Sequence, residues 1–255
     1  MKIAFLFCIL GRLAQEPLWR RWMAPHASRA SVYVHATRRA EAVQSPWIRR
    51  HAIPESIPSG HGEIGLVRAE LALLRHALSD PQNAKFVFCS RSCAPIKPFS
   101  TVHAALTADR RSWLAPHRAN PDRFRRVDPR VLPPWHFWKS SDWIALERTH
   151  AEALAAVDFT RAFRCFAPGE HYWASLLSMF GFDLDRETTG QSPTWADWRR
   201  WSPPRGHPYT FHRLTTDDCR RLRGLPHLFA RKFALDSDLL DHWPAIAGQP
   251  LPRES

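Results

Sequence analysis

The first hundred residues alternate between short apolar runs and one longer amphipathic segment. Residues 3–9 form a continuous apolar run, which is typical of a strand buried on both faces. Residues 31–35 and 85–90 are rich in β-branched and aromatic side chains, and they predict two further strands. Residues 66–78 place four apolar side chains at helical spacing: Val67, Leu71, Leu74 and Leu78. This order of strand and helix predicts an α/β fold with a mostly parallel central sheet flanked by helices.

The segments around these elements are less regular. Residues 16–23 have a helical pattern, whereas residues 38–62 contain prolines and glycines and predict mostly loop. Residues 110–136 are rich in arginine and proline and predict a long surface segment.

The second half of the chain predicts three more helices, at 143–157, 171–179 and 236–243, and a further element at 228–234. Residues 186–208 are rich in proline, tryptophan and arginine. The chain shows neither an internal repeat nor a linker, so residues 1–255 are expected to form one domain.

The common nucleotide-binding motifs are missing from this sequence. It contains no G-x-G-x-x-G and no P-loop pattern. A D-x-D pair, which can hold a metal ion on a diphosphate, occurs at 183–185 and at 236–238. Neither pair follows a predicted central strand, and the start of a helix or a turn explains both more simply.

Composition adds a strong positive charge. The net charge is +12 and the isoelectric point is about 10.4, which favours nucleic acid, anionic lipid or phosphorylated ligands. Only five of the 36 basic residues are lysine, and such arginine usage can equally reflect coding bias. The five cysteines have no disulfide or zinc spacing.

The apolar start of the chain is too short for a membrane span, which needs about 20 apolar residues. A buried first strand explains it better than a signal peptide does. A cytoplasmic location or a peripheral contact with a membrane is therefore expected, without a transmembrane segment.

Glu170 is the most informative candidate for catalysis. It follows Pro168 and Gly169 and precedes His171, and a carboxylate at such a turn can act as a general base towards a hydroxyl. A carboxylate favoured by the positive end of a helix has the same pattern, and the residues alone leave both interpretations open.

Seven segments in sequence order resemble the core-2/I-branching β-1,6-N-acetylglucosaminyltransferase family, glycosyltransferase family 14, and especially its plant-type branch. The segments are KIAFLFCILGRL with EPLWRRWM, SVYVHA, residues 65–102 with the loop SRSCAPI, FWKSSDWIAL, PGEHYWASLL, TWADW with GHPYTF, and LFARKF. Each segment is weak evidence alone, but together they cover nearly the whole chain.

This resemblance implies a fold of the GT-A type and an inverting transfer from a UDP-sugar without a metal ion or other cofactor. Glu170 falls on the catalytic base of the family, and Lys232 on the basic residue that neutralises the diphosphate. Trp198 falls on an aromatic residue of the acceptor site, and His35 lies on the uridine side.

Two positions depart from the family pattern. The second diphosphate-binding residue, an arginine, would fall on Tyr209, so Arg205 or Arg213 is expected to replace it. Gly169 stands where the family often has aspartate before the glutamate.

The expected donor is UDP-N-acetylglucosamine, with UDP-xylose as the alternative, and the expected acceptor is a glycan or glycoprotein. Nucleic acid is not expected as a partner. The rival interpretations are a basic nucleic-acid-binding protein, supported by charge and aromatic content, and a non-enzymatic lectin-like module.

Overall fold

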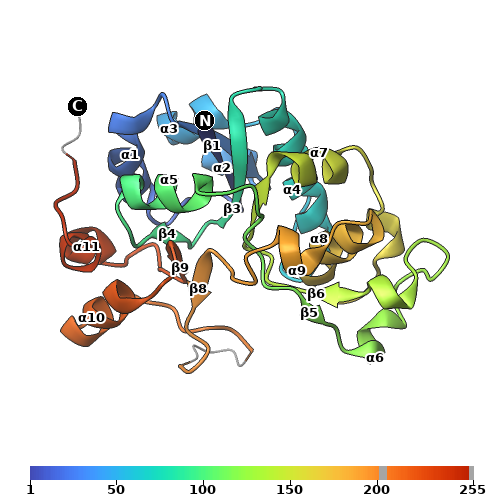
Figure 1. Ribbon diagram of the computed structural model, residues 1–255. Helices are drawn as coiled ribbons and strands as arrows, with labels where there is room; N and C mark the ends of the chain where they lie inside the picture. The colour runs from blue at the N-terminus through green and yellow to red at the C-terminus, as the bar shows by residue number, and fades with distance from the viewer. Residues whose placement is uncertain (201–205, 253–255) are drawn as a thin grey trace.

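A four-stranded sheet forms the centre of the protein (Figure 1). The computed structural model describes residues 1–200 and 206–252. The strands follow the order β2 (Ala30–Ala36), β1 (Lys2–Ile9), β3 (Asn83–Ser90) and β7 (Ala145–Glu147). The first three strands are parallel, and β7 pairs with β3 in the antiparallel direction. The expected α/β fold with a mostly parallel, helix-flanked sheet is therefore confirmed.

The central strand β1 contributes to two hydrophobic cores, because successive side chains of a strand point to opposite faces. One face buries Ile3, Phe5, Phe7 and Ile9. The other face buries Ala4, Leu6 and Cys8. This explains the uninterrupted apolar run in the sequence, since a strand buried on both faces has no polar side.

Helices cover both faces of the sheet (Figure 1). The first core receives side chains from α1 (Glu16–Met23), α3 (Pro46–His51), α5 (Phe99–Thr107), α10 (Thr216–Gly224) and α11 (Leu239–Ala247). The second core receives side chains from α4 (Ile64–Leu78), α7 (Arg148–Ala155), α8 (Gly169–Met179) and α9 (Leu184–Glu187). The remaining helical turns are α2 (Arg39–Ala42), α6 (Pro121–Phe124), η1 (Ala24–His26), η2 (Pro134–His136) and η3 (Thr160–Ala162).

A second, three-stranded sheet packs against the first core. Its order is β4 (Ala94–Pro95), β9 (Phe229–Arg231) and β8 (Thr194–Ala196). Phe229 of β9 stacks on Trp19 and meets the edge of Phe5. This aromatic contact fixes β9 to the central sheet, and with it the chain that follows β9. A separate two-stranded pair joins β5 (His117–Arg118) to β6 (Trp138–Lys139).

Several parts of the secondary structure differ from the expectations. The segment 143–157 is not one helix, because β7 pairs with the edge of β3 and α7 begins only at Arg148. Short helices α2 and α3 lie within the expected loop 38–62. Helix α10 was not expected, although Thr215 and Asp218 form a capping box at its start.

The two D-x-D pairs lie at helix starts. Asp183 caps α9 by accepting hydrogen bonds from the backbone of Asp185 and Arg186. Asp238 precedes α11 and accepts a hydrogen bond from the Leu214 backbone. Across the described residues, none of the helices is both long and apolar enough to cross a bilayer. The single domain over residues 1–255 stays a prediction.

Candidate active site

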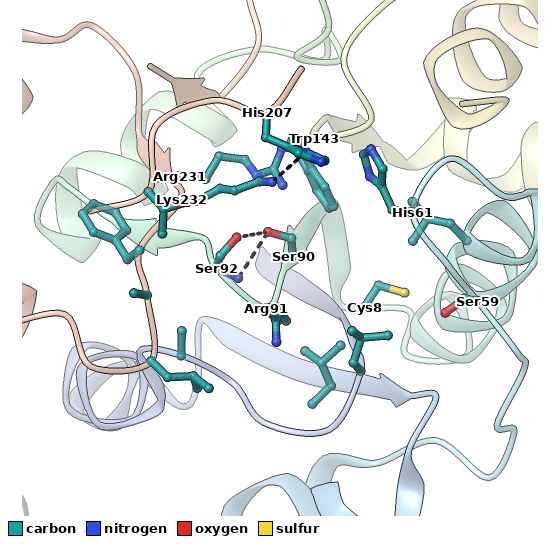
Figure 2. A pocket seen from close by; sticks show the side chains of 18 of the residues that line it. Cys8, Ser59, His61, Ser90, Arg91, Ser92, Trp143, His207, Arg231 and Lys232 are labelled. Carbon is teal, nitrogen blue, oxygen red and sulfur yellow. Dashed lines mark hydrogen bonds between the residues drawn. The ribbon is translucent and has the colours of Figure 1, made fainter. Parts of the chain in front are cut away.

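A cavity of about 610 Å³ opens at the carboxyl ends of β1 and β3, and we call it the strand-end cavity (Figure 2). Cys8 and Ile9 reach it from β1, and Ser90 from β3. Arg231 and Lys232 close it from the end of β9. In open α/β sheets this edge is the usual place for a ligand.

A second cavity of about 570 Å³ adjoins the first, and we call it the Glu170 cavity. Its lining includes Glu170, Asp142 and Trp198. Six residues line both cavities: His61, Leu66, Trp143, His207, Arg231 and Lys232. The two cavities are therefore parts of one cleft, in which Glu170, Lys232 and Trp198 come together.

Lys232 is the half-buried cation of this cleft. Its Nζ lies 3.5 Å from Nδ1 of His207. Burial first, and then the positive charges of Arg231 and Arg91, lower the pKa of the Lys232 amine to about 8. An anion in the cleft would relieve this repulsion, so the site is suited electrostatically to a phosphate-bearing ligand.

Arg231 and Arg91 add positive charge that the sequence expectations missed. The Arg231 guanidinium lies over the ring of Trp143, 4.5 Å from its centroid. Arg91 is exposed and lies at the turn after β3, on another side of the strand-end cavity (Figure 2). The sequence shows Arg231 and Lys232 as an adjacent basic pair, and this pair could have indicated a second cation in the cleft.

The turn after β3 is held by its own serines (Figure 2). The hydroxyl oxygen of Ser90 accepts a hydrogen bond from the Ser92 backbone at 3.3 Å and lies 3.2 Å from the Ser92 hydroxyl. The backbone of Phe233 donates to the Ser92 carbonyl at 2.9 Å. These bonds tie the end of β3 to the chain just after Lys232, which fixes both walls of the strand-end cavity.

Glu170 lies in the first turn of α8. Lys139 Nζ is 3.2 Å and an Arg123 guanidinium nitrogen 3.5 Å from the same carboxylate oxygen, Oε2. The backbone of Ser140 also donates to the Glu170 carbonyl at 2.8 Å. Two cations therefore hold the carboxylate in place from one side, and Oε1 has no hydrogen bond within the described residues.

Two buried carboxyl groups lie beneath Glu170. Burial first, and then the charge of Glu170, raise the pKa of Asp142 to about 7. Burial and then Asp142 raise the pKa of Glu70 as well. Both carboxyl oxygens of Glu70 and Oδ1 of Asp142 are buried, and none has a hydrogen-bond partner among the described residues.

Asp142 also explains the departure at position 169. A Cβ atom on Gly169 would collide with Oδ1 of Asp142. An aspartate at 169 would therefore lack space and would add a third acid beside Glu170 and Asp142. Glycine is the residue that this arrangement accommodates.

Trp198 stands at the rim of the Glu170 cavity, with 63% of its surface exposed. The neighbouring Asp197 is fully buried. It accepts hydrogen bonds from Arg200 at 2.7 Å and from Arg221 at 2.8 Å. Trp198 is thus an exposed aromatic side chain next to a firmly anchored residue.

The other predicted site residues lie elsewhere. His35 is fully buried; its Nε2 accepts a hydrogen bond from the Ile57 backbone at 2.8 Å. Arg213 is exposed and lies 3.8 Å from Asp238. Within the described part of the chain, neither residue lines the two cavities. Arg205 lies outside the described residues.

The fold and the cleft together define an α/β protein with a basic cleft that carries a carboxylate, at the carboxyl ends of a mostly parallel sheet. The sequence profile of the Core-2/I-Branching enzyme family matches residues 3–223. The chain therefore belongs to the Core-2/I-branching enzyme family.

Among curated proteins, the chain is similar to Glycosyltransferase BC10 of Oryza sativa subsp. japonica. The two are 28% identical over 239 residues, which covers 77% of this chain and 57% of the rice protein. The chain thus spans little more than half the length of this relative. Among solved structures, A197 from STIV matches with a TM-score of 0.30 and 10% identity, over 60% of this chain and 68% of A197; this likeness is too low to support an argument.

Proposed function

We propose that this protein is an inverting glycosyltransferase that moves N-acetylglucosamine from its UDP derivative to a hydroxyl group of a glycan. The observation that supports this most strongly is the shared cleft: Glu170, Lys232 and Trp198 all line the Glu170 cavity. Family membership supports the reaction class. The parallel strands β2, β1 and β3, with the cleft at their carboxyl ends, are compatible with a GT-A type fold.

In the proposed reaction, Glu170 removes the proton of the acceptor hydroxyl. The hydroxyl oxygen forms a bond to the anomeric carbon on the face opposite to the diphosphate. The bond between that carbon and the diphosphate oxygen breaks, and UDP leaves with the electron pair. A single displacement of this kind inverts the configuration at the anomeric carbon.

Positive side chains would stabilise the leaving diphosphate. Lys232 lies at the junction of the two cavities, where the breaking bond would be placed. Fixed charge aimed at the developing anion is usually a large contribution to catalysis. We propose that this charge takes the place of a metal ion and that the reaction proceeds in EDTA.

Trp198 would stack on the acceptor sugar, since aromatic faces bind sugar rings. The uridine would lie over the strand ends, on the side of His35. Because His35 is buried and bonded to the Ile57 backbone, it would act there by supporting the loop at Ile57.

The first test is UDP release from a panel of UDP-sugars in the presence of EDTA. We expect release from UDP-N-acetylglucosamine with a glycan acceptor. Glu170→Gln should lower turnover by about 10²–10⁴-fold, because loss of a general base typically costs that much, while UDP affinity stays nearly unchanged.

Glu152→Gln is a matched control, since Glu152 is an exposed partner of Arg148 on α7, and it should retain full activity. Turnover by Glu170→Gln at the wild-type rate would contradict the assignment of the base. Release from UDP-xylose alone would replace the proposed donor. Binding of nucleic acid that weakens steeply with salt, without UDP release, would favour the rival class.

A further inference from the structure

Arg231 is at the end of β9 and lines both cavities of the cleft. Its guanidinium is packed against the face of Trp143, 4.5 Å from the ring centroid. Figure 2 shows the Arg231 and Lys232 side chains extending side by side into the strand-end cavity. Two neighbouring positive groups thus point into the same space.

The charge of Arg231 has little compensation in the protein. Its Nε atom is buried without a hydrogen-bond partner, and within the described residues its guanidinium makes neither an ion pair nor a hydrogen bond. The nearby acidic groups that favour its charge are Cys93 and then Asp142, and both have raised pKa values, that of Asp142 about 7. Burying a charge without a partner is unfavourable, so the arrangement is suited to a ligand that brings the negative charge.

A diphosphate suits this pair of cations. A guanidinium offers a planar set of N–H donors that matches phosphate oxygens, and an ammonium acts as a compact point charge. After burial, the charge of Arg231 is the largest influence that lowers the pKa of the Lys232 amine. An anion between Arg231 and Lys232 would accept a hydrogen bond from the unpaired donor of Arg231. The same anion would offset the repulsion between the two positive charges.

Two other arginines fit this role less well. Arg213 has a side chain that is 81% exposed and faces Asp238. Arg91 is exposed and enters from the turn after β3. Of the described arginines, Arg231 combines a place at the junction of the cavities with a buried, unpaired Nε atom.

We infer that Arg231 is the second diphosphate-binding residue of this protein, in the role that the family pattern gives to an arginine at the position of Tyr209. This inference rests on the proposed function. Arg231 and Lys232 together hold the diphosphate of the donor, and Arg213 takes no part.

The test compares the affinities of UDP and uridine for the wild type, Arg231→Met and Arg213→Met, by calorimetry and ligand-observed NMR. Arg231→Met keeps an unbranched chain against Trp143 but removes the charge. We expect it to weaken UDP binding about 10–100-fold, as loss of a charge-assisted hydrogen bond does, and to leave uridine binding unchanged. Arg213→Met should bind both ligands as the wild type does.

Thermal unfolding without ligand separates binding from structure. Because Arg231→Met removes a buried, unpaired charge, its Tm without UDP should not fall below that of the wild type, and the rise in Tm on adding UDP should shrink. Arg231→Gln, which keeps a polar end, is measured in the same way as a second variant.

The inference is overturned if both variants bind UDP as the wild type does, or if they lose UDP and uridine affinity equally while Tm falls. If the wild type binds UDP while the inference fails, the proposed function is still supported. If the wild type does not bind UDP, both the proposed function and the inference are contradicted.

Discussion

At the scale of single residues, the lowered pKa of Lys232 makes the positive charge of the cleft depend on pH. Burial, Arg231 and Arg91 bring this pKa to about 8. The neighbouring His207 has a pKa below its usual range, through burial and then Lys232, so it stays neutral above pH 7. Cys93, also near Lys232, has a raised pKa because of burial.

We therefore expect UDP affinity to fall as pH rises from 7 to 9.5, because the free amine loses its charge in this interval and a neutral amine no longer attracts the diphosphate. Calorimetry in buffers of different ionisation enthalpy should show proton uptake on binding near pH 8. Lys232→Arg, which does not titrate in this range, should bind UDP with little dependence on pH. An equally steep fall in that variant would contradict the role of Lys232.

Asp142 gives a second prediction, on stability. Its folded-state pKa of about 7 is above its ordinary value of 3.8. Below pH 4 the group is protonated in both the folded and the unfolded chain. Between pH 4 and 7 the unfolded chain ionises while the folded chain keeps its proton, so the free energy of unfolding falls. Above pH 7 the group is ionised in both states, so the reduction in the free energy of unfolding stays constant.

Asp142→Asn should therefore raise the free energy of unfolding at pH 8, by about 1–4 kcal/mol for a shift of this size, and change it little at pH 4. Urea unfolding at the two pH values measures this difference. Asp217→Asn, at an exposed position on α10, is the control and should show no such dependence. Equal effects of Asp142→Asn at pH 4 and pH 8 would contradict the buried-acid interpretation.

At the scale of elements, Asp197 holds the position of the chain directly after β8. This carboxylate is fully buried and paired with Arg200 and Arg221. Burial raises its pKa, but the hydrogen bonds from Arg200 and the charge of Arg221 outweigh burial, so the pKa is lowered overall. Its contribution to stability is present above the unfolded-state pKa near 4 and is lost as pH falls through the lower folded-state pKa.

Asp197→Asn should lower the free energy of unfolding by about 1–3 kcal/mol at pH 7, because it removes the charge that a fully buried carboxylate offers to two half-buried arginines. Chemical denaturation measures the loss, and the exposed Asp185→Asn on α9 should stay within about 0.5 kcal/mol of the wild type. A loss below 1 kcal/mol for Asp197→Asn would show that this network does not anchor the segment.

Several elements could be read from local pattern, whereas strand β7 could not. The strands β1, β2 and β3 and the helix α4 have uninterrupted or periodic apolar positions, so the sequence predicts them well. The apolar residues 143–146 fit a helix or a strand equally. They form a strand because they pair with the edge of β3. This contact joins segments that are distant in sequence, so the local pattern does not reveal it.

The same distinction applies to the site. The resemblance led to Glu170, Lys232 and Trp198, and the fold brings all three to one cleft. Arg231 was not expected, because the family pattern places the second diphosphate-binding residue at the position of Tyr209. Successive side chains of a regular strand also point to opposite faces, which would bring only one of Arg231 and Lys232 into the cleft. Strand β9 ends at Arg231, so the alternation stops there and both residues line the cleft.

At the scale of the whole molecule, the two hydrophobic cores support different halves of the cleft. The first core contains Phe229 and Trp19 and holds β9, next to Arg231 and Lys232. The second core contains Trp173 of α8 and holds the helix that carries Glu170. Because β1 sends side chains into both cores, one central strand fixes the distance between the two halves.

The wall that the two cavities share has a kinetic consequence. Arg231, Lys232 and His207 belong to the lining of both cavities, so in the proposed reaction a nucleotide sugar bound at the strand ends would also border the space for the acceptor. A glycan that arrived first would cover the two cations and obstruct the way to the strand ends. For the proposed reaction we therefore expect an ordered mechanism, in which the nucleotide sugar binds first and the free nucleotide leaves last.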